Sequence, residues 1–207
     1  MIKIPVVLSE VTFIKGSTSV SNLPANDESI EFAVAGKSNV GKSSLLRLLF
    51  NNRKMVKVSR TPGRTREINF FRVDVKDGPS LVVADLPGYG YAKVPMSMRE
   101  EWGTFITDYL QSRTMLKAVF LLFDARRDVS EDEYEFIEWL KINNIKVFPV
   151  LTKVDQIPKT HWGKASISVT EACGMRPVMF SSLKPLGIDD IWRKVISLVN
   201  EESDGGT

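Results

Sequence analysis

The sequence predicts a single α/β domain in which a mainly parallel sheet carries helices on both faces. Continuous apolar runs at 118–124 and 147–152 are typical of strands that are covered on both sides. Segments with helical spacing of apolar residues alternate with these runs. A glycine-containing loop at 36–43 joins an apolar run at 30–35 to a helical pattern at 44–50, which is the strand, loop, helix order of such sheets.

Size and composition limit the possible classes of protein. The 207 residues suffice for one domain with a substantial core and are few for two. A hydrophobic content of 43% and a charged content of 26% are typical of soluble globular proteins. The net charge of +3 and the isoelectric point near 8.9 allow contact with nucleic acid without requiring it.

The single cysteine, Cys173, excludes an internal disulfide and favours a reducing compartment. We expect it to be a small, semi-buried residue and not a nucleophile, because the single histidine, His161, belongs to no catalytic pattern. The apolar runs are too short for a membrane span or a secretory signal. We expect a cytoplasmic protein without a membrane partner, and a monomer.

The order of elements follows from the same patterns. Residues 1–29 are expected to be an extension in which the alternation over 6–14 could add an edge strand, the main domain is expected over 30–200, and 201–207 are expected to be disordered. Inside the main domain we expect first the helix at 44–50, a mobile basic loop at 51–67, and strands at 68–75 and 81–85 joined as a hairpin. A helix opened by a capping box of Ser97 and Glu100 follows, then the strand at 118–124 and a helix opened by a capping box of Ser130 and Glu133. The last elements are the strand at 147–152, where Pro149 indicates a weak strand or a bulge, a strand at 177–180, and a helix from 188 to about 200.

The loop from Gly36 to Ser43 matches the phosphate-binding pattern G-x-x-x-x-G-K-[ST]. Lys42 is expected to reach the outer phosphates, and the hydroxyl of Ser43 to ligate magnesium. The alternative is a glycine-containing turn between two core elements, which the strand before it and the helix after it disfavour. The nucleotide contacts expected here are those of Gly36, Lys37, Ser38, Asn39, Val40, Gly41, Lys42, Ser43 and Ser44.

A second group of candidate residues follows the strand at 81–85. Asp85 is placed as a second carboxylate that organises the metal, and Gly88 as a backbone N–H donor to the terminal phosphate. An Asp-x-Pro-Gly sequence alone is a common turn, but at a strand end after a phosphate loop it is a strong signal. The expected contacts are those of Asp85, Leu86, Pro87 and Gly88.

Two later strand ends carry residues suited to a guanine base. Asp155 can accept hydrogen bonds from N1–H and the N2 amino group of guanine, which adenine cannot supply, while the stem of Lys153 covers the base. The alternative for these two residues is a solvated loop pair. The expected base contacts are those of Thr152, Lys153, Val154 and Asp155, together with backbone N–H groups of Ser181, Ser182 and Leu183 toward the guanine oxygen.

This ordered set of motifs, with a Thr-Pro-Gly-Arg-Thr loop at 61–65, resembles the translation-factor-related GTPases. The stretches 36–44, 61–65 and 85–92 are similar, more narrowly, to the EngB family of bacterial GTPases, and the resemblance spans about residues 22 to 200. It implies a Ras-like fold with a mainly parallel six-stranded sheet and one antiparallel edge strand. It also implies binding of GTP, GDP and magnesium, slow hydrolysis, a role in assembling the large ribosomal subunit with contact to its rRNA, and a link to normal cell division.

The resemblance assigns roles to the loop at 61–67. Thr65 takes the position of a switch threonine that gives magnesium a second hydroxyl ligand, with Thr61 as its rival, or as a turn residue before Pro62. The contacts implied for this loop are those of Gly63, Arg64, Thr65, Arg66 and Glu67. The residues implied for catalysis are Lys42, Thr65 and Gly88.

Three positions bear on the mechanism. Tyr89 follows the Asp-x-x-Gly motif where Ras-type proteins have glutamine, and it has no amide to orient a water, so we expect slow hydrolysis. Asn39 either helps to hold potassium, as in related GTPases, or braces the loop. Thr152 stands where many relatives have asparagine, so we expect the tie between the base loop and the phosphate loop to be lost and the nucleotide affinity to be modest.

Basic residues gather near the expected moving loops, at Lys54, Lys57, Arg60, Arg64, Arg66, Arg126 and Arg127. They indicate either a nucleotide-gated surface for ribosomal RNA or a solvated basic face. The motifs together predict a GTP-hydrolysing switch in which the γ-phosphate holds Thr65 and Gly88 and orders 51–67 and 86–97. The rival classes are an ATP-using enzyme with the same loop and an RNA-binding module whose hydrolysis is incidental.

Overall fold

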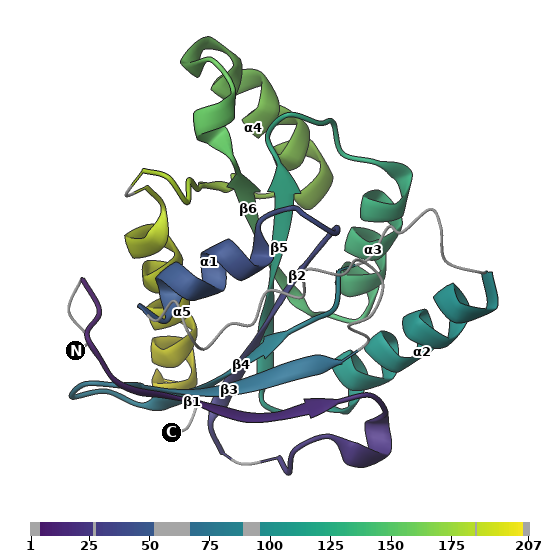
Figure 1. Ribbon diagram of the computed structural model, residues 1–207, viewed down its shortest axis with the longest axis vertical. Coiled ribbons are helices and arrows are strands. Elements are labelled where there is room, and N and C mark those ends of the chain that lie inside the picture. Colours follow the sequence, from purple (N-terminus) through teal and green to yellow (C-terminus); the bar gives the residue numbers. More distant parts are fainter. Residues whose placement is uncertain (1–4, 27, 52–66, 89–95, 185, 205–207) are drawn as a thin grey trace.

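The computed structural model describes residues 5–26, 28–51, 67–88, 96–184 and 186–204. These residues form one seven-stranded sheet with the strand order β1-β3-β4-β2-β5-β6-β7. Helices pack on both of its faces (Figure 1). The strands are β1 Leu8–Ser17, β2 Ile30–Gly36, β3 Ile68–Val75, β4 Ser80–Asp85, β5 Leu116–Asp124, β6 Lys146–Thr152 and β7 Val178–Met179. The helices are α1 Lys42–Leu49, α2 Met96–Ser112, α3 Glu131–Ile142, α4 Lys159–Cys173 and α5 Ile188–Asp204, with 3₁₀ turns η1 Val20–Asn22 and η2 Val154–Gln156.

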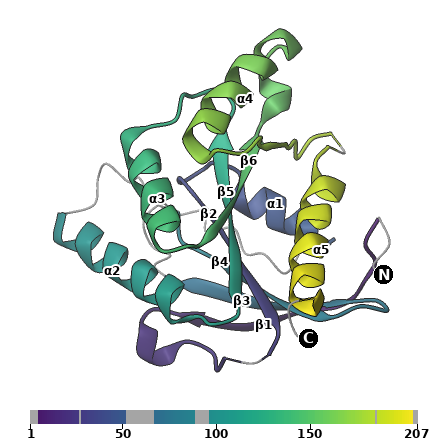
Figure 2. The same cartoon turned by 180° about the vertical axis from the view of Figure 1, so that it is seen from behind.

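Two hydrophobic cores lie on opposite faces of the sheet. Helices α1 and α5 cover one face, and α2, α3 and α4 cover the other, as the two opposite views show (Figures 1 and 2). Side chains of β2 and β5 alternate between the two cores because successive residues of a strand point to opposite faces: Phe120 and Leu122 enter one core, and Val119 and Leu121 the other. This explains why these strands appear in the sequence as unbroken apolar runs.

The added strand β1 makes the sheet one strand wider than the six strands expected. It pairs antiparallel with β3, and the rings of Phe13 and Phe71 meet edge to face with centroids 5.5 Å apart. Strand β3 is in turn antiparallel to β4, which confirms the predicted hairpin, while β4, β2, β5, β6 and β7 are parallel. The edge strand leaves Phe13 48% exposed.

Four elements differ from the expected ones. Helix α4 was not predicted, because its sequence is largely polar and only Val169 and Ala172 are buried. Helix α2 begins at Met96, one residue before the expected cap Ser97, and α5 continues to Asp204. In β6, Pro149 is buried and pairs regularly with Leu121 of β5. The two-residue strand β7 pairs with Val150 and Leu151, which follow Pro149 in β6. A proline is tolerated there because it lies outside the pairing with β7.

A buried polar network connects the start of β2 to the end of α2. The carboxylate of Glu31 accepts hydrogen bonds from Tyr109 Oη at 2.7 Å and from Arg113 Nη2 at 2.6 Å, and Arg113 Nη1 donates to Pro24 O at 2.8 Å. Burial, and then the neighbouring Glu31 carboxylate, raise the pKa of Tyr109 far above its usual value, so the phenol stays protonated and remains a donor. The network therefore fixes the end of α2 against the sheet.

None of the helices in the described part of the chain is both long and apolar enough to cross a membrane.

Candidate functional site

The carboxyl ends of five parallel strands meet at one edge of the sheet, where the predicted motifs come together. The segments that leave β2, β4, β5, β6 and β7 are 36–43, 86–88, 124–130, 152–156 and 180–184. The pairing of Asn69 with Asp85 brings the start of β3 to the same edge. In open α/β sheets this edge is where ligands bind.

The phosphate loop is shaped by residues with left-handed backbone. Asn39 has φ 62° and Gly41 has φ 116°, and a Cβ at Gly36 would lie only 2.9 Å from Val40 Cγ1 and 3.0 Å from Leu122 O. The residue before α1 is Gly41, which has no side chain that could cap the helix. The first N–H groups of α1 have no partner within the helix, so they are available to stabilise an anion at its N-terminus.

Lys42 and Asp85 face each other across this space. Lys42 Nζ lies 3.0 Å from Asp85 Oδ1, and each side chain is 13% exposed. The approach lacks hydrogen-bond geometry, so Asp85 Oδ1, like Ser38 Oγ, is buried without a hydrogen-bond partner among the described residues. Orphaned polar atoms of this kind fit a site built for a phosphate and its magnesium ion, because both would supply the missing partners.

The segment after β4 lies directly against the phosphate loop. Leu86 N donates to Val34 O at 3.0 Å, which continues the pairing of β4 with β2. A Cβ at Gly88 would lie 2.8 Å from Ser38 Oγ and 3.1 Å from Ser38 Cα, so this close approach favours glycine. The backbone of Gly88 thus lies beside the loop, and its hydrogen bond to a terminal phosphate stays a prediction.

The tie between the base loop and the phosphate loop is present, which corrects the expectation for Thr152. Its hydroxyl lies 2.6 Å from Val40 O and 2.9 Å from Phe123 O, and the side chain is fully buried. A hydroxyl at this position makes the contact expected only of an amide because β6 brings it within reach of the loop backbone. The expectation of modest affinity therefore loses its basis.

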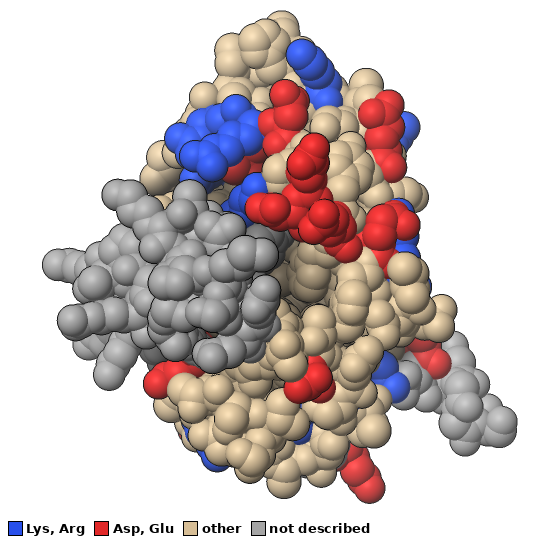
Figure 3. All heavy atoms as spheres, turned by 90° about the vertical axis from the view of Figure 1, so that its right-hand side faces the viewer, with Lys and Arg blue, Asp and Glu red and all other residues tan. Residues whose placement is uncertain are grey.

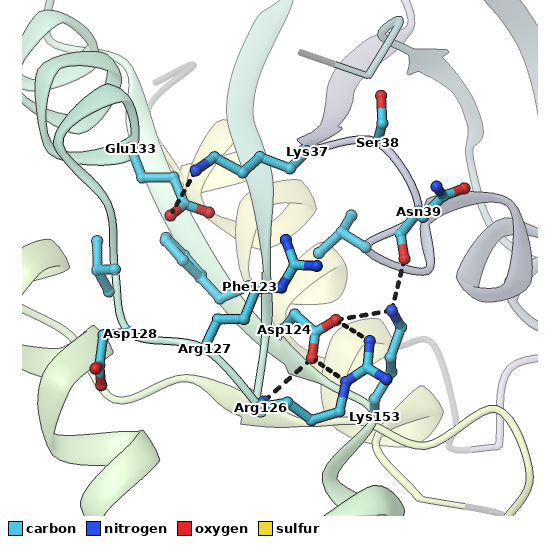
Figure 4. Close-up of a pocket in the computed structure, with 12 residues that line it drawn as sticks. Lys37, Ser38, Asn39, Phe123, Asp124, Arg126, Arg127, Asp128, Glu133 and Lys153 are labelled. Carbon is cyan, nitrogen blue, oxygen red and sulfur yellow. Dashed lines mark hydrogen bonds and ion pairs between the residues drawn. The ribbon is translucent and has the colours of Figure 1, made fainter. Parts of the chain in front are cut away.

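Lys153 makes a second tie to the same loop. Its backbone is left-handed, with φ 58°, and its ammonium donates to Asn39 O at 2.6 Å and to Asp124 Oδ2 at 2.7 Å. Asp124 also accepts two hydrogen bonds from the guanidinium of Arg126, at 2.8 and 2.7 Å (Figure 4). Sequence reasoning missed Asp124, although its place at a strand end, like that of Asp85, was a signal.

The side chain of Lys37 points away from the enclosed space of the loop. Its ammonium donates to Ser130 Oγ. It also lies 3.6 Å from Glu133 Oε2 at the start of α3 (Figure 4). Glu133 also accepts hydrogen bonds from Ser130 N at 2.9 Å and Ser130 Oγ at 2.8 Å, which confirms the predicted capping box. The cavity between the loop, 123–129 and Lys153 measures about 100 Å³.

Asp155 and the loop after β7 lie next to each other. Asp155 is half-buried in η2, and Val154 N donates to Phe180 O at 3.4 Å. Ser181 Oγ accepts from Leu183 N at 3.2 Å, and Ser181 N donates to Leu186 O at 3.3 Å. The N–H groups of Ser181 and Leu183 are thus already used within the loop, while the side chains of Ser182 and Leu183 are exposed.

Several predicted residues lie outside the described part of the chain: Lys54, Lys57, Arg60, Thr61, Gly63, Arg64, Thr65, Arg66 and Tyr89. Glu67 is described and exposed at the entry to β3. Arg126, one of the predicted basic residues that the structure describes, forms an ion pair with Asp124. Acidic side chains gather beside basic ones on the face shown in Figure 3, and α3 opens with Glu131, Asp132 and Glu133.

The chain matches the family model described as "50S ribosome-binding GTPase" over residues 31–153. It is 39% identical over 191 residues to "Probable GTP-binding protein EngB" of Geobacter metallireducens, covering 91% of each chain. The protein of the same name from Syntrophotalea carbinolica is 40% identical over 203 residues, covering 96% of each. A solved structure of a probable GTP-binding protein engB has a TM-score of 0.65 at 20% identity, covering 83% of this chain and 99% of that one.

The hydroxyl of Thr152 can be tested with a substitution that keeps the shape of the side chain. Thr152→Val removes the donor to Val40 O, and we expect a loss of about 1–3 kcal/mol in the free energy of unfolding together with weaker GDP binding. Urea denaturation and fluorescent GDP titration measure the two effects. The matched control is Thr170→Val, because that hydroxyl bonds only within α4, to Ser166 O. Equal effects of the two substitutions would contradict the role of Thr152.

Proposed function

Because the chain belongs to the EngB family of GTP-binding proteins and is a GTPase, we propose that it is a slow GTP-hydrolysing switch in the assembly of the large ribosomal subunit, linked to normal cell division. The observation that carries the proposal is the meeting of three motifs at one sheet edge. The phosphate loop, the Lys42–Asp85 pair and the loop that contains Asp155 all lie there. The protein acts as a cytoplasmic monomer.

The nucleotide binds with its phosphates in the loop and its base between two later loops. N–H groups at the start of α1 and the ammonium of Lys42 hold the phosphates, which replace the direct attraction between Lys42 and Asp85. Asp155 accepts hydrogen bonds from N1–H and N2 of guanine. The next loop contacts the guanine oxygen, with the N–H of Ser182 as the donor that needs the least rearrangement.

Magnesium would be held by the hydroxyls of Ser43 and Thr65, with Asp85 as a carboxylate that supports the site. The orphaned oxygen of Asp85 supports this assignment because it is buried and negatively charged beside the loop. The bound ion neutralises charge on the phosphate oxygens. Lys42 and the backbone N–H groups of the loop stabilise the remaining negative charge as the terminal phosphate is transferred to water.

Two features make hydrolysis slow and coupled to conformation. The residue after Gly88 is Tyr89, which has no amide to orient the attacking water. Gly88 already lies against Ser38, so the terminal phosphate contacts a segment whose position depends on the phosphate loop. Contact of the γ-phosphate with Gly88 and Thr65 orders the loops around 51–67 and 86–97, and hydrolysis releases them.

The ribosomal partner is large-subunit RNA, contacted through the basic residues of 51–67. The description of the matched family supports this partner. The start of α3 is acidic and Arg126 is committed to Asp124, so this side of the molecule is a poor surface for RNA. RNA therefore binds on the switch side of the site, where its affinity depends on the bound nucleotide.

Guanine selection is tested by displacement of labelled GDP. We expect GTP to compete at least about a hundredfold better than ATP, because ATP would leave the carboxylate of Asp155 unpaired. Asp155→Asn should abolish this preference, while Asp108→Asn, at an exposed position of α2, should not change it. Displacement by ATP as effective as by GTP would instead indicate an ATP-using enzyme.

Potassium dependence is tested by exchanging potassium for sodium in a phosphate-release assay. If Asn39 holds a potassium ion against the phosphates, GTP turnover is expected to be several times slower in sodium. Asn39→Gly tolerates the left-handed backbone at φ 62° and should remove the difference between the two cations. A wild-type rate that is the same in both salts would leave Asn39 as a residue that only braces the loop.

Ribosomal action is tested by co-sedimentation with isolated large subunits. We expect binding with a non-hydrolysable GTP analogue, weaker binding with GDP, and a loss of binding as salt concentration rises because phosphate contacts dominate. Phosphate release should increase when subunits are added. Association that ignores the nucleotide, with no stimulation of hydrolysis, would favour an RNA-binding module with incidental GTPase activity.

A further inference from the structure

We propose that Asp124 is a positioning residue for nucleotide binding, whose buried carboxylate holds the ammonium of Lys153 between the base loop and the phosphate loop. The inference rests on the proposed function, because it gives a role to residues of the same guanine-nucleotide site. The side chain of Asp124 acts on the site through Lys153.

The sheet places Asp124 beside the base loop. It is the last residue of β5 and pairs with Thr152, and Ala125 N donates to Thr152 O at 3.0 Å. The side chain of Asp124 is 9% exposed, and its Oδ2 lies 2.7 Å from Lys153 Nζ. A charged group at this depth is stable only with charged partners.

Arg126 saturates the rest of the carboxylate. Its Nε donates to Oδ1 at 2.8 Å, its Nη2 to Oδ2 at 2.7 Å, and its backbone N to Oδ1 at 3.1 Å. Burial raises the pKa of Asp124, but the hydrogen bonds from Arg126 and Lys153 outweigh it and hold the pKa well below its usual range. The carboxylate is therefore charged at neutral pH, and the bidentate guanidinium fixes its orientation.

The fixed carboxylate determines where the ammonium of Lys153 lies. Lysine has a flexible four-carbon stem, so an unanchored side chain would have to be ordered when the base binds. Here the ammonium is shared between Asp124 Oδ2 and Asn39 O, so contacts within the protein anchor the side chain. The same contact holds Asn39 in its left-handed conformation, which shapes the phosphate loop.

The opposite end of the same cavity shows why this role belongs to Asp124. There Lys37, a residue of the phosphate loop itself, pairs with Glu133 of α3. This pair holds the beginning of the loop. Asp124 acts on the middle of the loop, through a lysine that comes from the base loop. It therefore links the two halves of the nucleotide site, whereas the Lys37 contact links the loop to a helix.

The test compares nucleotide dissociation with hydrolysis. Asp124→Asn keeps the shape and removes the charge, and we expect a fluorescent GDP analogue to dissociate about tenfold faster. Single-turnover hydrolysis at saturating GTP should stay within about twofold of wild type, because Asp124 does not touch the reacting atoms. Arg126→Gln, at a side chain that is 43% exposed, should produce a smaller change in the same direction.

A double-mutant cycle shows whether Asp124 acts through Lys153. In a Lys153→Met background, Asp124→Asn should produce no further increase in the dissociation rate. The control is Asp190→Asn, which breaks an exposed pair with Arg193 on α5 and should change nothing. If Asp124→Asn does not fold, the cycle is run with Arg126→Gln and Lys153→Met.

Two outcomes would overturn the inference. One is an equal effect of Asp124→Asn with and without Lys153, and the other is an unchanged dissociation rate accompanied by a lower melting temperature of the nucleotide-free protein. Failure of the proposed function is distinguishable, because wild-type protein would then show no preference for GDP over ADP.

Discussion

The site depends on how the backbone of the phosphate loop is held open. Two of its carbonyl groups are bonded by side chains from the neighbouring strand end: Val40 O by the hydroxyl of Thr152, and Asn39 O by the ammonium of Lys153. A loop that encloses an anion cannot satisfy these carbonyls internally while its N–H groups converge on the ligand. External donors therefore make the concave shape stable, and both come from the loop that is expected to bind the base.

The same edge concentrates charge in a small volume. Lys42 faces Asp85, Lys153 faces Asp124, and Lys37 faces Glu133. The last two pairs are completed by further hydrogen bonds, from Arg126 and from Ser130. The Lys42–Asp85 pair is incomplete, because an oxygen of Asp85 remains without a hydrogen bond among the described residues. Pairs that are complete brace the loop, and the incomplete one is where a phosphate and a metal ion would be accommodated.

The frame behind the site is rigid for a different reason. Strands β2 and β5 are buried on both faces, and the Glu31–Arg113–Tyr109 network attaches the end of α2 to the first of them. This network and the hydrogen bond from Arg113 to Pro24 O hold the end of α2 against the sheet.

The sequence by itself determined the parallel sheet, the loop between β2 and α1, and the place of the predicted base-binding segment at the end of β6. Each depends on local chemistry: an apolar run, a glycine where the backbone turns sharply, or a carboxylate that follows a strand. The roles assigned to particular residues of these motifs are still predictions, and the sequence did not indicate helix α4, whose buried face consists of few residues. Only the tertiary structure decided that Thr152 keeps the tie to Val40, that Lys37 turns toward α3, and that Asp124 holds Lys153. These contacts join residues between 29 and 112 positions apart, and which side chains meet across such distances depends on the register of the strands and not on any local pattern.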